Sequence, residues 1–302
     1  MLNFGRAVLF GLRNGHRNRF GDRMSQSREG EVIARLYVFI FVVTAIAVLT
    51  LIARQFELLW PIDDNLPQSD VVSDWKVVTL NLILAQLAQP FAGACGAVVI
   101  SAAGGGLIHL RTDGWWYLIS LTGVVIVSDL YLYCLHRLQH GVPVLWALRS
   151  FHHSAEALTF VTGARHLWLD RAIATALLSV IPILVTIPGD LAAVIAIIFF
   201  LPNGCAQLNL RLRLGPPVTW LNNPQWHRIH HSVQPEHQHK NFVSLLPIWD
   251  ILFGTAWIPR SDEYPAAGLV LGEKPGLIDS VVWPVRHYLR GLRIGIPNGG
   301  KS

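Results

Sequence analysis

The chain has little charge and few cysteines. Only 14% of its 302 residues are Asp, Glu, Lys or Arg, against about 25% in ordinary soluble domains. Its three cysteines have no paired spacing, which argues against a disulfide scaffold and against cysteine-based zinc or iron–sulfur sites. The zinc-protease signature His-Glu-x-x-His is missing. The net charge of +5 is not gathered in one basic domain, so nucleic acid is not an expected partner.

In place of charge, the chain has long apolar segments. A helix that spans a bilayer needs about 20 mostly apolar residues. Five stretches of roughly this length carry no charged residue, except for Asp129 in the third. The pattern predicts an all-α, polytopic membrane protein with four to five hydrophobic helices. The stretches cover 36–53, 77–108, 114–135, 172–189 and 191–210.

Charges beside the apolar segments predict the orientation. The first 33 residues are arginine-rich and contain no secretory signal, so they are expected on the cytoplasmic side. The acidic loop after the first span then belongs on the opposite side. The stretch 77–108 is interrupted by Pro90 and is interpreted as a re-entrant hairpin. The stretches 172–189 and 191–210 are expected to form a helical hairpin. The histidine-rich segments would then face the cytoplasm of a bacterial inner membrane.

Seven of the thirteen histidines fall in three short clusters. A helix brings residues three or four apart to one face, and adjacent residues project about 100° apart. Neutral imidazole binds iron, zinc and copper, and a site rich in imidazole with few carboxylates suits iron. Three such clusters hold more imidazoles than one metal needs, so they predict a two-metal centre at the membrane surface. The clusters are His136-x-x-x-His140, His152-His153 and His227-x-x-His230-His231.

Two further side chains continue the helical face of the first cluster. Asp129 and Tyr133 precede His136 at helical spacing and share its stripe. An acidic residue in a membrane span is costly and normally has a partner. Asp129 either makes a structural hydrogen bond to a neighbouring helix, or it orients a ligand histidine or the helix that bears it. We predict the second role.

The clusters belong to longer motifs, and in this order the motifs are specific. They are Asp129-x-x-x-Tyr133-x-x-His136-Arg137-x-x-His140, Trp146, His152-His153-Ser154, Pro224-Gln225-Trp226-His227-Arg228-Ile229-His230-His231-Ser232, Asn241-Phe242 and Trp249-Asp250-x-Leu252-Phe253-Gly254-Thr255. Over roughly 115–256 the chain resembles the fatty acid hydroxylase / sterol desaturase superfamily of integral-membrane di-iron oxygenases. The resemblance implies two iron ions held by the histidine boxes, O2 as co-substrate and electrons from an outside donor.

The resemblance also implies roles for single residues and a division of the chain. The seven clustered histidines would hold the irons, Asp129 and Tyr133 would support the first box, and Asn241 would hydrogen-bond within the site. The predicted parts are a basic N-terminal surface segment (1–33), N-terminal membrane segments (34–114), the di-iron catalytic region (115–256) and a C-terminal tail (257–302).

Several positions depart from the family pattern. Arg149 stands where the second box normally opens with histidine, and a protonated guanidinium has no lone pair for a metal. Gln207 replaces a histidine that is frequent before the third box. The family's Arg-x-His-Pro reads Arg165-His166-Leu167-Trp168, and its Asn-Phe-Gly reads Asn241-Phe242-Val243. Either one metal site is weakened, or a further histidine completes the shell. The candidates are His166, His237 and His239.

The expected function is that of a membrane monooxygenase, which hydroxylates or desaturates a lipid. The substrate would be a fatty acyl chain, sterol, ether lipid or amino-lipid, and the electrons would come from an external reductase or carrier. One alternative is a non-catalytic descendant that binds lipid or metal, motivated by Arg149 and Gln207. The other is a histidine-lined metal transporter, which is less favoured because the clusters lie at span ends rather than at mid-membrane.

Overall fold

The computed structural model divides the chain into two compact units, Met1–Leu49 and Thr50–Ser302. The predicted basic segment 1–33 lies outside the described residues. The second unit contains the three histidine clusters. The structure describes residues 36–37, 39–102, 104, 106–178, 181, 185–273 and 275–294.

Four helices in this described part are long and apolar enough to cross a membrane. The prediction of an all-α, polytopic membrane protein is therefore confirmed. Large apolar side chains such as Leu87, Phe91 and Val98 are exposed on these helices, as expected for surfaces that lipid covers. The candidate spans are Phe39–Leu59, Gln68–Ala88 within α2 (Gln68–Ala102), α3 (Trp116–Gly141) and α7 (Gly189–Ala206).

The re-entrant hairpin predicted over 77–108 is wrong. α2 is one continuous helix through Ala102, with Pro90 in its interior. A proline removes a single intrahelical hydrogen bond, whereas a full turn inside the bilayer would leave many backbone groups unsatisfied. A continuous helix therefore costs less free energy than a turn when this apolar stretch crosses the bilayer.

The continuous α2 also corrects the predicted sides. The acidic loop that follows Phe39–Leu59 was expected across the membrane from the histidine clusters. In the structure, Asp63 of this loop pairs with Arg228 of the third cluster at 2.6 Å. Its backbone N–H also donates to the side chain of Asn209. The loop and the clusters therefore lie on the same side.

Of the helical hairpin predicted over 172–189 and 191–210, the second helix forms as a full span, whereas the first is short. α5 (Trp168–Leu178) is shorter than a span, and within the described residues the chain continues as strand β2 (Val185–Thr186). β2 pairs in parallel with β1 (Ile108–His109), and α7 follows. Gly106 allows this contact, because a Cβ there would collide with Thr186.

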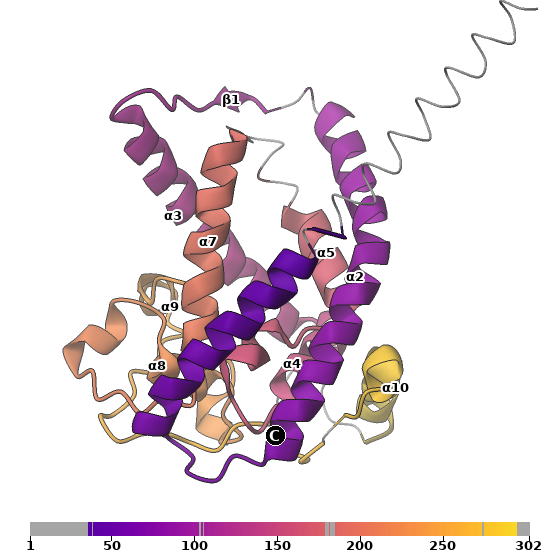
Figure 1. The fold of residues 1–302 in the computed structure, drawn as a ribbon, viewed down its shortest axis with the longest axis vertical. Helices are drawn as coiled ribbons and strands as arrows, with labels where there is room; N and C mark the ends of the chain where they lie inside the picture. The colour runs from indigo at the N-terminus through magenta and orange to yellow at the C-terminus, as the bar shows by residue number, and fades with distance from the viewer. Residues whose placement is uncertain are drawn as a thin grey trace, which may run out of the picture. The chain divides into compact units, whose positions relative to one another are not determined.

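Short elements gather around the C-terminal ends of α3 and α7 (Figure 1), and the end of α3 carries the first histidine cluster. α10 packs on α4, where Trp283 donates to the Ser150 hydroxyl at 3.0 Å. One core cluster contains Leu148 and Phe151, and another contains Tyr133, Trp226 and Phe242. These elements are α4 (Pro143–His153), η1 (Phe160–Ala164), η2 (Pro216–Thr219), α8 (Pro224–His230), η3 (Pro235–His237), α9 (Ile248–Leu252) and α10 (Asp279–Ile294).

Candidate metal centre

Each histidine cluster lies at the end of a helix. The first occupies the last turns of α3, the second ends α4, and the third lies on α8 and its C-cap. α8 is only seven residues long, and its start is fixed by its sequence. Asn223 at its N-cap accepts hydrogen bonds from the backbone of Gln225 and Trp226, and Pro224 supplies a helical φ at the first position.

The clusters meet as two groups of buried histidines. Within each group, one ring nitrogen per residue lies within 4.8 Å of the others. Adjacent residues enter different groups in both the second and the third cluster, as the 100° helical step predicts. Four histidines form the first group, namely His136, His140, His153 and His230, and three form the second, namely His152, His227 and His231.

Backbone carbonyls orient several of the rings. Nδ1 of His136 lies 2.6 Å from the Phe242 carbonyl, and Nδ1 of His230 lies 2.9 Å from that of Lys240. A carbonyl accepts only, so these Nδ1 atoms carry the proton and leave the Nε2 lone pair for the interior. Nε2 is buried without a hydrogen-bond partner in His140, His153 and His230. Such orphaned acceptors facing one point fit a bound cation.

Burial keeps the rings outside the spans neutral. Desolvation lowers the pKa of His230 to about 3, and it holds the pKa of His152, His153, His227 and His231 well below the ordinary value. Nearby cationic groups, Arg149 among them, lower these pKa values further. Since neutral imidazole is the form that binds metal, the residues fit a metal centre.

Arg149 reaches into the first group. Its Nη2 donates to Nε2 of His136 at 3.0 Å, and its Nη1 lies 3.3 Å from Nδ1 of His166. Burial lowers the pKa of Arg149 to about 10, opposed by Asp170, so the guanidinium stays charged at neutral pH. It therefore engages a lone pair that a metal would otherwise use.

Gln207 reaches into the second group. It caps the C-terminus of α7 and is buried. Its Nε2 lies 3.2 Å from Nε2 of His152, 2.7 Å from that of His227 and 3.3 Å from that of His231. The two positions where the sequence departs most from the family pattern are thus both in contact with the histidine groups.

The three additional candidate ligands lie outside both groups. His166 stacks on His152 at 4.5 Å between ring centroids, and its Nδ1 lies 3.2 Å from Asp170. His239 has its ring 6.5 Å from that of His140. The prediction of His237 as a ligand is not supported by the geometry, because its nitrogens face Ser232 and Glu263.

The three predicted supporting residues hold the backbone around the site. Asp129 accepts from the backbone of Leu245 and Leu246 and from the Trp249 indole, so it ties α3 to the loop that carries these residues. Tyr133 shares a hydrogen bond with Thr255 at 2.9 Å. Asn241, at φ 58°, bonds the backbone of Trp226 and Trp257. Because Asp129 and His136 share α3, the predicted role of Asp129 in orienting a ligand histidine or the helix that bears it stays a prediction.

Asp250 is a site residue that the sequence reasoning missed. It accepts from the backbone N–H groups of Phe242 and Val243 and from the Thr255 hydroxyl. The carbonyl of Phe242 in turn orients His136. Asp250 thus positions a histidine through the backbone, and its place in the Trp249-Asp250 motif was the only available signal.

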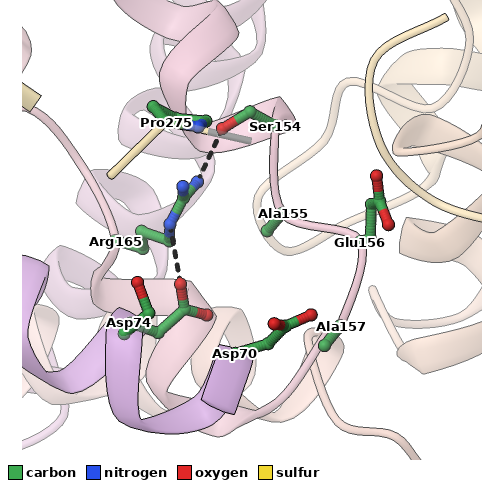
Figure 2. Close-up of a pocket in the computed structure, with 9 residues that line it drawn as sticks. Asp70, Asp74, Ser154, Ala155, Glu156, Ala157, Arg165 and Pro275 are labelled. Atoms are coloured by element: carbon green, nitrogen blue, oxygen red, sulfur yellow. Dashed lines mark hydrogen bonds and ion pairs between the residues drawn. The ribbon is translucent and has the colours of Figure 1, made fainter. Parts of the chain in front are cut away.

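A second missed contact anchors the second cluster to α2. Arg165 pairs with Asp74 at 2.8 Å and donates to Ser154, which directly follows His153. Figure 2 shows Arg165 between these two residues, at a pocket that Asp70 and Glu156 also line. His152 is held by the same segment, since its Nδ1 lies 3.3 Å from the Arg165 carbonyl.

The fold and the site together define a class of helical membrane protein in which two groups of buried histidines, suited to binding metal, lie at the ends of helices. Residues 121–255 match the fatty acid hydroxylase family. Over this region the chain is similar to the fatty acid hydroxylase / sterol desaturase superfamily, which confirms the resemblance predicted from the sequence.

Relatives in other organisms agree with this assignment. The alkylglycerol monooxygenase of Danio rerio is 33% identical over 149 residues, which are 49% of this chain and 31% of the relative. The human alkylglycerol monooxygenase is 32% identical over 49% of this chain and 32% of its own length. The ornithine lipid hydroxylase OlsE of Rhizobium tropici is 25% identical over 62% of this chain and 56% of its own length. The chain thus spans about a third to a half of these relatives. No solved structure matches it significantly.

Proposed function

We propose that the protein is a membrane-bound di-iron oxygenase that hydroxylates or desaturates a lipid, with O2 and an external electron donor. The observation that carries the proposal is the pair of buried histidine groups, seven imidazoles in all, inside the region that matches the family. Two irons held there would supply the activation of O2 for C–H oxidation. The clustered histidines would hold them, and their burial would keep water away from the site.

Lipid is the substrate class that the comparisons favour. The relatives named above are an alkylglycerol monooxygenase and an ornithine lipid hydroxylase, and both names describe lipids. His136 and His140 lie in the last turns of α3, a candidate span, so the proposed site would be close to the acyl or alkyl chains of the bilayer. We infer an ether lipid or amino-lipid substrate, with a fatty acyl chain or sterol as the next candidates.

The orientation is also part of the proposal. Arg137, Arg211 and Arg213 flank spans on the histidine side, which favours the cytoplasmic face of a bacterial inner membrane. This choice replaces the expectation that residues 1–33 are cytoplasmic, because the span Phe39–Leu59 precedes the Asp63 loop, which shares the histidine side. A cysteine in place of the exposed Asp262 tests this. An impermeant maleimide should label it in inverted vesicles and not in intact spheroplasts, with the unsubstituted protein as the control. Labelling in intact spheroplasts would show that the histidine side faces away from the cytoplasm.

Metal content is the first test of the centre. Detergent-purified protein from iron-replete cells should contain close to two irons per chain by plasma mass spectrometry. The His230→Ala variant should lose iron. Iron near zero, or one tightly held zinc, would contradict the di-iron proposal.

Activity is tested on lipids from cells that express the protein under isotopically labelled O2. A hydroxylated lipid should carry one labelled oxygen, whereas a desaturated lipid should lack two hydrogens. Neither product should form with His230→Ala. A metal-loaded protein that yields neither product across ether-lipid, amino-lipid, fatty acyl and sterol substrates would refute the oxygenase activity.

One observation favours the non-catalytic alternative, namely the hydrogen bond from Arg149 to His136 Nε2. Arg149→His restores the imidazole that the family has at this position. A large gain in iron would indicate a decayed site, whereas an unchanged iron content would favour a rearranged shell that works with arginine in place.

A further inference from the structure

We propose that Gln207 is a metal ligand, and that its side-chain oxygen completes the second group formed by His152, His227 and His231. The two metal positions would then differ in their donors and in their affinities. This inference rests on the metal centre of the proposed function and specifies how its two halves differ.

The amide of Gln207 lies where the three rings converge. Its Nε2 is 2.7 to 3.3 Å from the Nε2 atoms of all three histidines. An amide nitrogen has two hydrogens, so it donates to at most two of these atoms at once, and the Nε2 atoms of His227 and His231 lie 3.2 Å from each other. Its Oε1 is buried without a hydrogen-bond partner, in a residue that is 3% exposed. This arrangement leaves the oxygen of a buried amide unsatisfied, which is costly.

A cation resolves this conflict. Half a turn of the amide exchanges Nε2 and Oε1 and presents an oxygen lone pair to the centre of the group. Without a cation this would bring four lone pairs together, so the nitrogen faces the rings instead. Metal–ligand distances are about 2.0 to 2.2 Å for nitrogen and oxygen. The amide must therefore withdraw as an ion enters, and the flexible glutamine side chain permits this.

The first group needs no such helper. It contains four imidazoles, and Nε2 of His140, His153 and His230 has no hydrogen-bond partner. Imidazole is a better donor than a neutral amide oxygen for borderline transition metals. Within this group Arg149 engages only His136, so three imidazole nitrogens of the first group stay open despite its charge. We therefore expect the first ion to enter the four-histidine group and the second to bind more weakly beside Gln207.

Cobalt(II) titration tests the inference without any turnover. The full chain in detergent micelles is stripped with a chelator and titrated without oxygen, by calorimetry and by visible absorption. Two steps of unequal affinity are expected. Gln207→Ala should weaken the second step by at least about 10-fold, the loss that even an outer partner of a ligand causes. Gln207→His should tighten it by a similar factor, and neither variant should move the first step.

Asn203→Ala is the matched control. Asn203 is an amide one turn earlier on α7, and its side chain donates to the Phe199 carbonyl instead of facing the histidines. Both steps should be unchanged in this variant. Gel filtration and thermal unfolding will show whether Gln207→Ala folds. If it does not, the inference is tested by Gln207→His alone, in which the second metal-binding step should be tighter.

The outcomes separate this inference from the proposed function. A second step that is unchanged or tighter in Gln207→Ala, or no tighter in Gln207→His, would overturn Gln207 as a ligand and leave the metal centre intact. Failure of the unsubstituted protein to bind cobalt would overturn both.

Discussion

Arg149 donates a hydrogen bond to Nε2 of His136 at 3.0 Å, at the nitrogen through which this ring would join the other histidines of its group. The guanidinium is buried and stays charged, since its pKa is lowered only to about 10. A positive charge in this place opposes a cation in two ways, by repulsion and by occupying a donor atom. The protein therefore carries a built-in competitor for its own first metal position.

Arg149→Met should tighten the first metal-binding step. Methionine fills similar space without charge, and it frees Nε2 of His136. We expect a gain of about 10-fold or more, since losing one charge-assisted hydrogen bond is worth about 1.5 to 3 kcal/mol. The measurement is the cobalt titration. Arg137→Met is the control, because its side chain bonds Tyr133 rather than a histidine. A weaker first step in Arg149→Met would show that the arginine supports the site.

Asp250→Asn should destabilise the protein and loosen the first group. The carboxylate accepts from two backbone N–H groups and one hydroxyl. An asparagine keeps one acceptor oxygen and turns a donor toward the others, which costs about 1 to 3 kcal/mol. The thermal unfolding midpoint in detergent should fall, and the first metal step should weaken because the Phe242 carbonyl no longer holds His136. Asp262→Asn, at an exposed position, should change neither quantity.

Substitutions of Arg165 and Asp74, which form an ion pair, should have strongly non-additive effects on stability. Both side chains are nearly buried, at 5% and 11% exposure. Removing one partner leaves the other charge buried, at a cost of about 3 to 5 kcal/mol. Asp74→Asn and Arg165→Gln should each lower the unfolding midpoint, and the double variant should be less destabilised than the sum of both. Additive effects would argue against the pair.

The exposed pair Arg111–Asp113 is the matched comparison, with side chains 60% and 67% exposed. Asp113→Asn should leave the unfolding midpoint almost unchanged, because water screens such pairs. If Asp113→Asn lowered the unfolding midpoint as much as Asp74→Asn, burial of the ion pair would not determine its contribution to stability.

The histidine groups could be predicted from the sequence because they depend on the spacing of residues that are close in the chain. Helical spacing alone places His136 beside His140 and sends His152 and His153 in different directions. The long-range contacts followed no such rule. Asp63 meets Arg228 across 165 residues, and nothing in the spacing of either indicates it. The family pattern marked Arg149 and Gln207 as departures, but only the structure shows which histidines they contact.

The errors in the fold have one physical origin. Breaks such as Pro90 and the glycines of α2 were interpreted as a turn, although a bilayer strongly favours an unbroken helix. Placing a turn there also reversed the predicted side of the Asp63 loop. The pairing of β1 with β2 was not expected, because two-residue strands have no recognisable sequence period.

Acid should destabilise the metal-free protein. Burial lowers the pKa of His166 to about 4 and that of His230 to about 3, whereas unfolded histidine titrates near about 6.5. At pH values between these two pKa values, the unfolded chain binds protons that the folded protein does not bind. The free energy of unfolding therefore rises with pH and falls as the pH is lowered. Each such histidine contributes a slope of up to about 1.4 kcal/mol per pH unit below 6.5. The unfolding free energy of chelator-treated protein should be flat above pH 7 and fall toward pH 5.

His166→Gln should reduce this slope by about one histidine's share, because an uncharged amide at this position binds no proton in either state. His109→Gln, at an exposed position of β1, should leave it unchanged. A metal-free protein equally stable at pH 7 and pH 5 would show that the buried rings accept protons freely. The neutral imidazoles on which the metal centre depends would then not be imposed by burial.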